Sequence, residues 1–218
     1  MAAISSNAMG SLAQVSKNTS ARLAGATAAC NPQEVRDQVL SAYLERTFGI
    51  NRLTITSWIK KAKHLPSLSE KLLPAQSDDV LELDEVWSFV QKKANKSWLW
   101  IGLCRRMLEV VAYAVGGRGT EVCEQLKASI PQMYGHVQTV SDFLEPYKNV
   151  FGKNHKRVGK ETGETSHVER WINTLRQRLG RLVRKTLSFS KTQENHEASI
   201  KLFIHEYNIS ARSKYFSA

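Results

Sequence analysis

The pattern of apolar and polar positions predicts an α/β protein with its strands in the middle of the chain. Between 80 and 90 the two kinds of residue alternate, as in a strand with one buried face. Two apolar runs follow at short intervals, which is typical of an antiparallel meander. The predicted strands cover 80–90, 97–104, 108–117, 136–142 and 155–159, with a helix at 119–130.

Two helices are predicted to close the fold, at 165–185 and 190–208, which gives a mixed sheet flanked by helices. The first has an apolar stripe of period near 3.6, formed by Val168, Ile172, Leu175, Leu179, Leu182 and Val183. Glu169, Asn173, Arg176 and Gly180 share another face of this helix, because they follow one another at intervals of three or four residues. That face presents a carboxylate, an amide and a guanidinium together.

The N-terminal part is predicted to be organised differently. Residues 1–31, rich in Ser and Ala, are interpreted as a disordered tail, and 32–64 as a short helix-turn-helix remnant with a turn at Gly49. On its second helix Arg52, Thr56 and Lys60 are candidates for DNA contact. A basic helical hairpin that only packs on the next domain is the alternative. A linker at 65–78, a catalytic domain at 79–210 and a tail at 211–218 complete the predicted organisation.

The charge balance adds a partner to this picture. The formal net charge is +11 over 218 residues, which favours a polyanionic partner such as DNA, although a basic chain can also bind membrane surfaces or be simply soluble. Residues 153–185 hold ten Lys or Arg against three Glu, so much of the excess surrounds Glu169. Three cysteines without a C-x-x-C pair, and the absence of an apolar run of about 20 residues, indicate a cytoplasmic protein that does not span a membrane.

Three carboxylates are candidates for a metal site. Asp84 lies within the first predicted strand, Asp142 ends the fourth and Glu169 lies on the basic helix. Like charges brought together are destabilising unless a cation intervenes, and oxygen ligands of this kind suit Mg²⁺. Taken singly, each carboxylate is more simply a surface or ion-pairing residue.

Other residues compete for these roles. The rival carboxylates are Glu82, Glu85 and Glu145, and His167 is either a general base or, more simply, a structural or DNA-contacting residue. Trp87, Trp98, Trp100 and Trp171 are interpreted as aromatics of the core or its edge.

Three stretches carry a resemblance to a known family. They are "LLPAQSDDVLELDEVWSFV", "VSDFLEPY" and "VGKETGETSHVERWINTLRQRLGRLVRKTLSFSK", and they closely resemble the transposases of the insertion sequence one family. The resemblance implies a ribonuclease-H-like catalytic domain that cleaves and joins DNA with Mg²⁺ or Mn²⁺. It assigns the metal-binding, catalytic positions to Asp84, Asp142 and Glu169, and the basic residue near the DNA to Arg176. Asn173 and Arg178 are further candidates for DNA contact on the same helix.

The same resemblance shapes the remaining expectations. The zinc-finger cysteines of the family are absent from this sequence, and Ile172 stands where the family commonly has an asparagine. We expect a bacterial, nucleoid-associated protein that binds double-stranded DNA at element ends and target, as a homo-oligomer when active. Two alternatives are a defective copy that only binds DNA, and a nuclease or resolvase of the same fold that cuts without joining.

Overall fold

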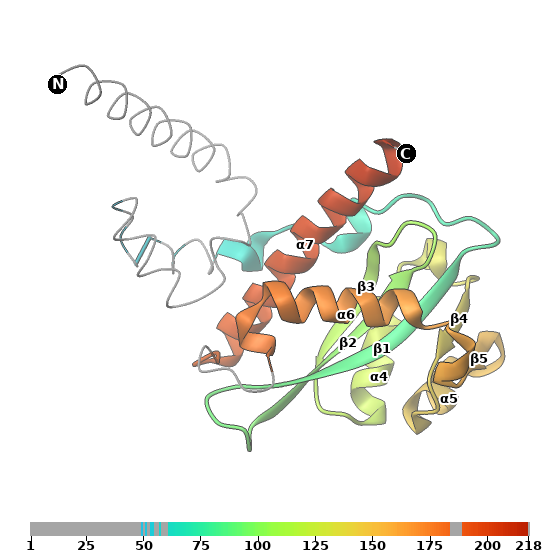
Figure 1. Cartoon of the computed structure of the whole chain (residues 1–218), viewed down its shortest axis with the longest axis horizontal. Helices are drawn as coiled ribbons and strands as arrows, with labels where there is room; N and C mark the ends of the chain where they lie inside the picture. Colours follow the sequence, from blue (N-terminus) through green and yellow to red (C-terminus); the bar gives the residue numbers. More distant parts are fainter. Residues whose placement is uncertain are drawn as a thin grey trace, which may run out of the picture.

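The computed structural model describes residues 49, 51, 53, 54, 57, 61–183 and 189–217. Within them, five strands form one mixed sheet in the order β3-β2-β1-β4-β5 (Figure 1). The strands are β1 (Val80–Phe89), β2 (Lys96–Cys104), β3 (Val110–Gly116), β4 (Gln138–Ser141) and β5 (His155–Arg157). β1, β2 and β3 form the antiparallel meander, whereas β4 runs parallel to β1 and β5 parallel to β4. The predicted α/β class, a mixed sheet flanked by helices, is confirmed.

Helices cover both faces of this sheet. They are α4 (Thr120–Ser129), α5 (Glu145–Phe151), α6 (Ser166–Arg178) and α7 (Gln193–Ser217), with short 3₁₀ turns at Ala62–His64, Leu68–Glu70, Gln132–Tyr134, Gly152–Asn154, Lys160–Thr162 and Gly180–Leu182. α4 and α5 lie on one face, and α6 and α7 on the other (Figure 1). β2, which lies between β3 and β1, is an almost unbroken apolar run because both of its faces are covered.

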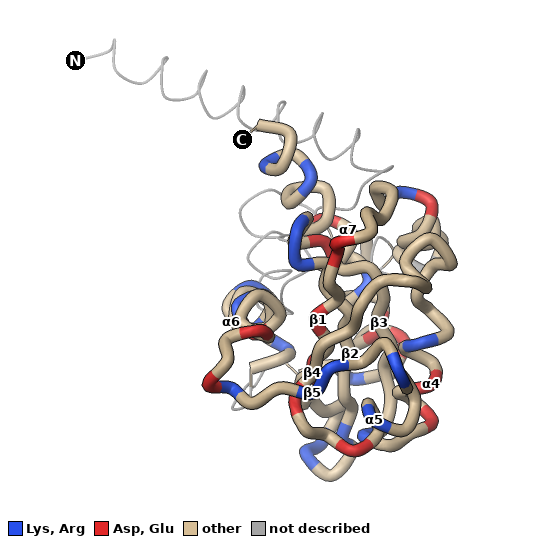
Figure 2. Tube along the Cα trace, turned by 90° about the vertical axis from the view of Figure 1, so that its right-hand side faces the viewer, with Lys and Arg blue, Asp and Glu red and all other residues tan. Residues whose placement is uncertain are grey.

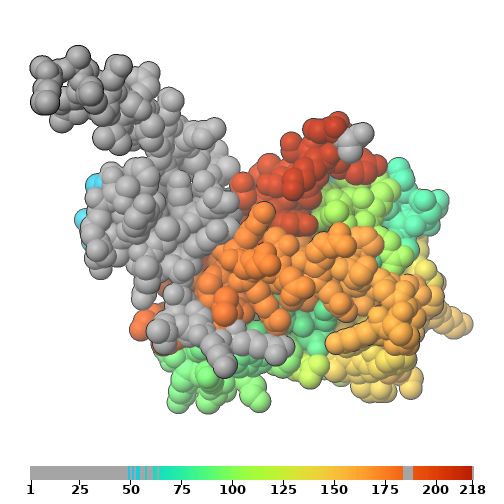
Figure 3. Space-filling view, in the orientation of Figure 1, coloured from blue at the N-terminus to red at the C-terminus, as the bar shows by residue number. Residues whose placement is uncertain are grey.

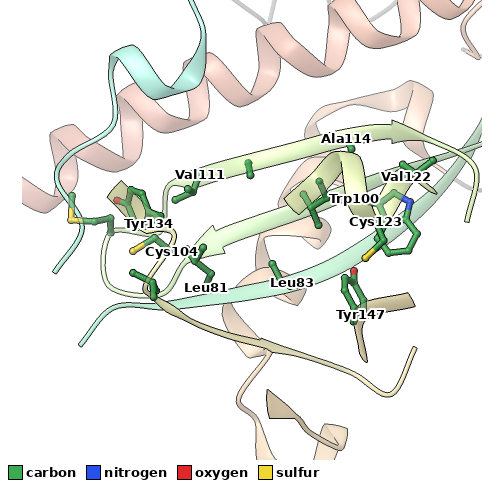
Figure 4. Close-up of a cluster of buried hydrophobic side chains, with 14 residues drawn as sticks. Leu81, Leu83, Trp100, Cys104, Val111, Ala114, Val122, Cys123, Tyr134 and Tyr147 are labelled. Atoms are coloured by element: carbon green, nitrogen blue, oxygen red, sulfur yellow. The ribbon is translucent and has the colours of Figure 1, made fainter. Parts of the chain in front are cut away.

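Each face of the sheet has its own apolar core. On the α4 side Trp100 is fully buried and meets Tyr147 of α5 edge-on, at 5.2 Å between ring centroids (Figure 4). On the other side Trp171 of α6 makes edge contacts with Phe203 and Tyr207 of α7, each at 5.8 Å. The two closing helices are therefore fixed to each other as well as to the sheet.

The closing helices differ from their predicted bounds. α6 ends at Arg178, because Leu179 adopts an extended backbone (φ −119°, ψ 90°), and Gly180 belongs to the following 3₁₀ turn. Gly180 therefore does not continue the face of Glu169. α7 begins at Gln193 and extends through Ser217, so residues 211–217, predicted as a tail, are helical.

The segment 65–78, predicted as a linker, packs on the domain. Leu72 and Leu73 lie against the core on the α4 side, and the buried Tyr134 hydroxyl donates to the carbonyl of Leu73 at 3.0 Å. The Lys201 ammonium of α7 donates to the carbonyl of Leu65 at 2.8 Å. This segment is therefore held to the domain at its first residue and again at Leu72 and Leu73.

Several predictions fall outside the described residues. These are the tail at 1–31 and most of the helix-turn-helix at 32–64, including Arg52, Thr56 and Lys60. In the part of the chain that the structure describes, Cys104 and Cys123 are buried, free thiols. No helix in that part is long and apolar enough to cross a membrane.

Candidate active site

The site lies where β4 ends beside β1. The parallel pairing aligns Val80 with Gln138 and Glu82 with Val140, and it stops there. β1 continues through Asp84, whereas β4 ends at Ser141 and the polypeptide leaves the sheet at Asp142. The carboxyl end of a strand that adjoins such a divergence is where open α/β sheets commonly bind ligands. The ending of the parallel pair thus places two carboxylates at one opening.

Asp84 is the most perturbed of these carboxyl groups. Its Oδ1 accepts a hydrogen bond from the backbone amide of Glu85 at 2.7 Å. Burial, together with the neighbouring charges of Glu85, Asp142 and Glu169, raises the pKa of Asp84 to about 7. The carboxyl group is therefore partly protonated near neutral pH and is held among other acids.

Glu169 reaches this opening from the first turns of α6. Its Oε1 accepts a hydrogen bond from the buried Thr165 hydroxyl at 3.3 Å. Asp142 also has a local anchor, because its Oδ1 accepts the amide of Leu144 at 3.0 Å. Each carboxylate is thus oriented by a contact within its own segment.

Glu82 holds the start of α6 in place. Its Oε2 accepts the backbone amides of His167 and Val168, both at 3.0 Å, so a strand residue caps the helix from across the fold. Its Oε1 accepts the Arg105 guanidinium at 2.7 Å and lies 2.8 Å from the His167 ring. Glu82 is fully buried. It is therefore a structural carboxylate, and His167 is its partner.

The other rival carboxylates are also occupied. The Arg118 guanidinium donates to Glu85 at 2.7 Å and 3.1 Å, and the Tyr147 hydroxyl donates to its other oxygen at 3.2 Å. Burial nevertheless raises the pKa of Glu85 above its usual value. Glu145 is exposed and lies 3.7 Å from both Lys148 and Arg157.

One cavity of about 430 Å³ brings the predicted residues together. Its lining includes Asp84, Asp142, Glu169, Asn173 and Arg176, all predicted from sequence. Arg178 is different, since it lines another cavity on the far side of α6. We call the first one the acidic cavity.

Four further lining residues were not predicted as part of a site. Lys160 and Arg118 add positive charge at the acidic cavity, and Trp87 and Trp98 form its aromatic wall. The Arg118 guanidinium lies 4.5 Å from the centre of the Trp98 ring, in cation–π contact. These aromatic side chains were predicted to lie in the core or at its edge, and the strand pairing adds that Trp98 stands opposite Trp87.

The donor chemistry of the acidic cavity fits a divalent cation. Asp84, Asp142 and Glu169 offer the hard oxygen ligands that Mg²⁺ prefers. The raised pKa of Asp84 reflects burial first and repulsion by neighbouring carboxylates second, and a bound cation would offset both. Among the described residues, no group of three or more His, Cys, Asp or Glu side chains is already gathered closely enough to hold a metal ion.

Fold and site together define an α/β domain with an acidic cavity bordered by basic and aromatic side chains. Residues 80–209 match the protein family described as IS1 transposase, and the chain is a member of that family.

Relatives carry the same family name. The chain is 38% identical over 128 residues to the insertion element iso-IS1n protein InsB of Shigella dysenteriae, which covers 59% of this chain and 95% of the relative. It is 36% identical over 129 residues to the IS1 protein InsB of Shigella flexneri, covering 59% and 93%. It is 34% identical over 146 residues to an IS1 protein InsB of Escherichia coli K12, covering 66% and 83%.

Proposed function

We propose that this member of the IS1 transposase family is a DNA transposase that cleaves and joins strands at the acidic cavity. The observation that carries the proposal is the meeting of three carboxylates from separate elements, a strand, a strand end and a helix, in one cavity. Burying carboxylates close together destabilises their ionised forms, and the raised pKa of Asp84 reflects this destabilisation. A function that needs a divalent cation explains why the cluster is present.

Asp84, Asp142 and Glu169 would hold Mg²⁺ or Mn²⁺. When bound, the metal supplies Lewis-acid activation of an attacking oxygen and stabilisation of a leaving oxygen. The residues of the chain provide the rest. Asn173 and Arg176 lie one and two helical turns beyond Glu169 on the same face of α6. They would hold the phosphodiester in line by an amide and a guanidinium, which suit phosphate oxygens.

Double-stranded DNA is the proposed partner, both as element end and as target. The net charge of +11 supplies the sequence-independent attraction to phosphate. Joining two ends requires more than one active site, so we propose a homo-oligomer for the active form.

A cleavage and strand-transfer assay tests the proposal. The substrate is a plasmid that carries the gene's own flanking DNA, incubated with Mg²⁺ or EDTA. We expect Asp84→Asn and Glu169→Gln each to reduce product by about 100-fold or more, because each removes a charge from the metal ligand set. Glu145→Gln, an equal change on an exposed side chain, should retain activity. Full activity in both ligand variants would reject the assignment.

A defective copy that only binds DNA is the alternative function. A departure from the family pattern favours it, because Ile172, which lines the acidic cavity, stands where an asparagine is common. It predicts salt-dependent DNA binding and no Mg²⁺-dependent product from the wild-type chain. A product that is cut but never joined would instead indicate a nuclease.

A further inference from the structure

A second cavity, of about 350 Å³, lies on the other side of α6 from the acidic cavity. It is bounded by α6, the C-terminal half of α7 and the turn between β2 and β3. Among its lining residues are Arg106, Thr174, Arg178, Tyr207, Lys214 and Tyr215. We call it the basic cleft. The proposed chemistry at Asp84 does not use any of these side chains.

The charge of the basic cleft is positive. Arg178 and Lys214 are exposed at its rim, while Arg106 is held by the buried carboxylate of Asp79 at 2.7 Å and 2.9 Å. Within the described residues, no carboxylate lines this cavity. Lys and Arg also mark α6 and the C-terminal end of α7 in Figure 2. The cleft therefore attracts an anion.

Two tyrosines give the basic cleft aromatic surface. Tyr215 is 40% exposed, and the Arg106 guanidinium lies 5.8 Å from the centre of its ring and donates to its hydroxyl at 3.1 Å. Tyr207 is fixed at 5.8 Å from the Trp171 ring. Cations next to accessible aromatic rings are the surface on which single-stranded nucleic acids bind, with phosphates on the cations and bases on the rings.

The basic cleft lies within reach of the acidic cavity. α6 (orange) and α7 (red) adjoin on one surface of the molecule (Figure 3), and α6 separates the two cavities. From Glu169 to Arg178 the helix rises about 14 Å, a length that a few nucleotides cover. Arg170 is exposed on the same helix between them. One DNA strand can thus span the distance.

We propose that the basic cleft binds the single DNA strand that leaves the acidic cavity, with its phosphates on Arg178 and Lys214 and a base against Tyr215. This inference rests on the proposed function for the path of the strand. The binding itself requires no metal and no cleavage.

Binding of a fluorescent oligothymidine of about twelve nucleotides tests the proposal, measured in EDTA over a range of salt. The full chain carries Asp84→Asn throughout, so no strand is cut. Arg178→Ala with Lys214→Ala should lower the slope of log affinity against log salt by about 1.4, since each phosphate contact to a single strand contributes about 0.7. Lys148→Ala with Lys153→Ala removes the same charge near α5 and should leave binding and slope nearly unchanged.

Variants of Tyr215 distinguish base stacking on the ring from the attraction of phosphates to charge. Tyr215→Ala should weaken binding about fivefold or more with an unchanged salt slope, because stacking on an aromatic ring is lost and no charge is removed. Tyr215→Phe should bind like the parent, since the ring remains. The inference is overturned if the double variant at Arg178 and Lys214 binds oligothymidine like the control double variant at Lys148 and Lys153. It is also overturned if Tyr215→Phe binds as weakly as Tyr215→Ala.

These results are independent of the transposase assignment. Loss of oligothymidine binding in the basic-cleft variants supports the cleft even if the wild-type chain makes no DNA product. Normal oligothymidine binding in those variants overturns the cleft even if the changes at Asp84 and Glu169 abolish strand transfer.

Discussion

Removing the buried carboxylate of Glu82 should loosen the start of α6. The side chain accepts two backbone amides at 3.0 Å and the Arg105 guanidinium at 2.7 Å, and it lies 2.8 Å from the His167 ring. Glu82→Ala leaves these buried donors unmatched and Arg105 without its partner, which costs about 3–5 kcal/mol. Glu82→Gln keeps one acceptor oxygen and the shape, so we expect about 2 kcal/mol.

Urea unfolding of the full chain measures these differences in the free energy of unfolding. Glu145→Gln is the matched control, because this carboxylate is 62% exposed and its ion pairs span 3.7 Å. We expect the control to stay within about 0.5 kcal/mol of the parent. A typical domain has only about 5–15 kcal/mol in total, so Glu82→Ala should unfold at much lower urea.

Strand-transfer activity provides a second readout for Glu82. Because α6 carries Glu169, misplacing its first turn should lower activity more in Glu82→Ala than in Glu82→Gln, under conditions where both are folded. The reasoning is wrong if the free energy of unfolding of Glu82→Ala lies within about 0.5 kcal/mol of the parent's, because loss of a buried acceptor of several hydrogen bonds should destabilise the fold by more than that.

Three further predictions concern titration and the edge of the sheet. Burial and the Arg181 charge lower the pKa of His196 to about 4 from 6.5. The unfolded chain therefore binds this proton more readily between the two values, and stability should fall by up to about 3 kcal/mol as pH drops from 6.5 to 4. His196→Gln should flatten that part of the stability–pH curve, and an unchanged curve would count against this origin. The pKa of Asp84 is raised to about 7, so Mn²⁺ followed by electron paramagnetic resonance should bind several-fold tighter at pH 8 than at pH 6. Asp84→Asn should weaken binding and remove the difference, whereas a pH dependence that survives would assign it to another group. The buried Asn208 amide pairs with both backbone groups of Val110, at 2.9 Å and 2.8 Å, so Asn208→Ala should lower the unfolding free energy by about 2–4 kcal/mol. Thermal unfolding checks this, and a change under about 0.5 kcal/mol would contradict it.

The strands were predictable because their patterns are local. Alternation located β1 at Val80–Phe89 against a predicted 80–90, and the apolar run at 97–104 located β2 at Lys96–Cys104. The end of α6 was not predictable in the same way. The apolar stripe continues past Arg178 through Leu182, yet the chain turns at Leu179 to bury Leu182 in a 3₁₀ turn. Periodicity alone does not distinguish a continuing helix from a tighter turn that buries the same residue.

α5 was missed for a related reason. It has only seven residues, Glu145–Phe151, and Pro146 lies in its first turn. A proline at that position is compatible with a helix but also marks turns and loops. So short a segment cannot show a clear helical period. Its identity depends on packing, in which Tyr147 is buried against Trp100.

The three acids of β1 show which part of the candidate site could be predicted from the sequence and which part could not. Glu82 and Glu85 were both rivals of Asp84 in the sequence, yet each is paired with an arginine from a distant segment, Arg105 and Arg118 respectively. Around Asp84, the two strongest influences are burial and the charge of Glu85; both raise its pKa and outweigh the hydrogen bond from the Glu85 amide, which lowers it. Only long-range pairing makes this distinction, so a linear pattern could point to the strand but could not separate structural from functional acids. Arginine neutralises Glu82 and Glu85, whereas Asp84 lies among further acids. We therefore expect a cation from solution to bind at Asp84, and a proton to replace it in part when no cation is bound.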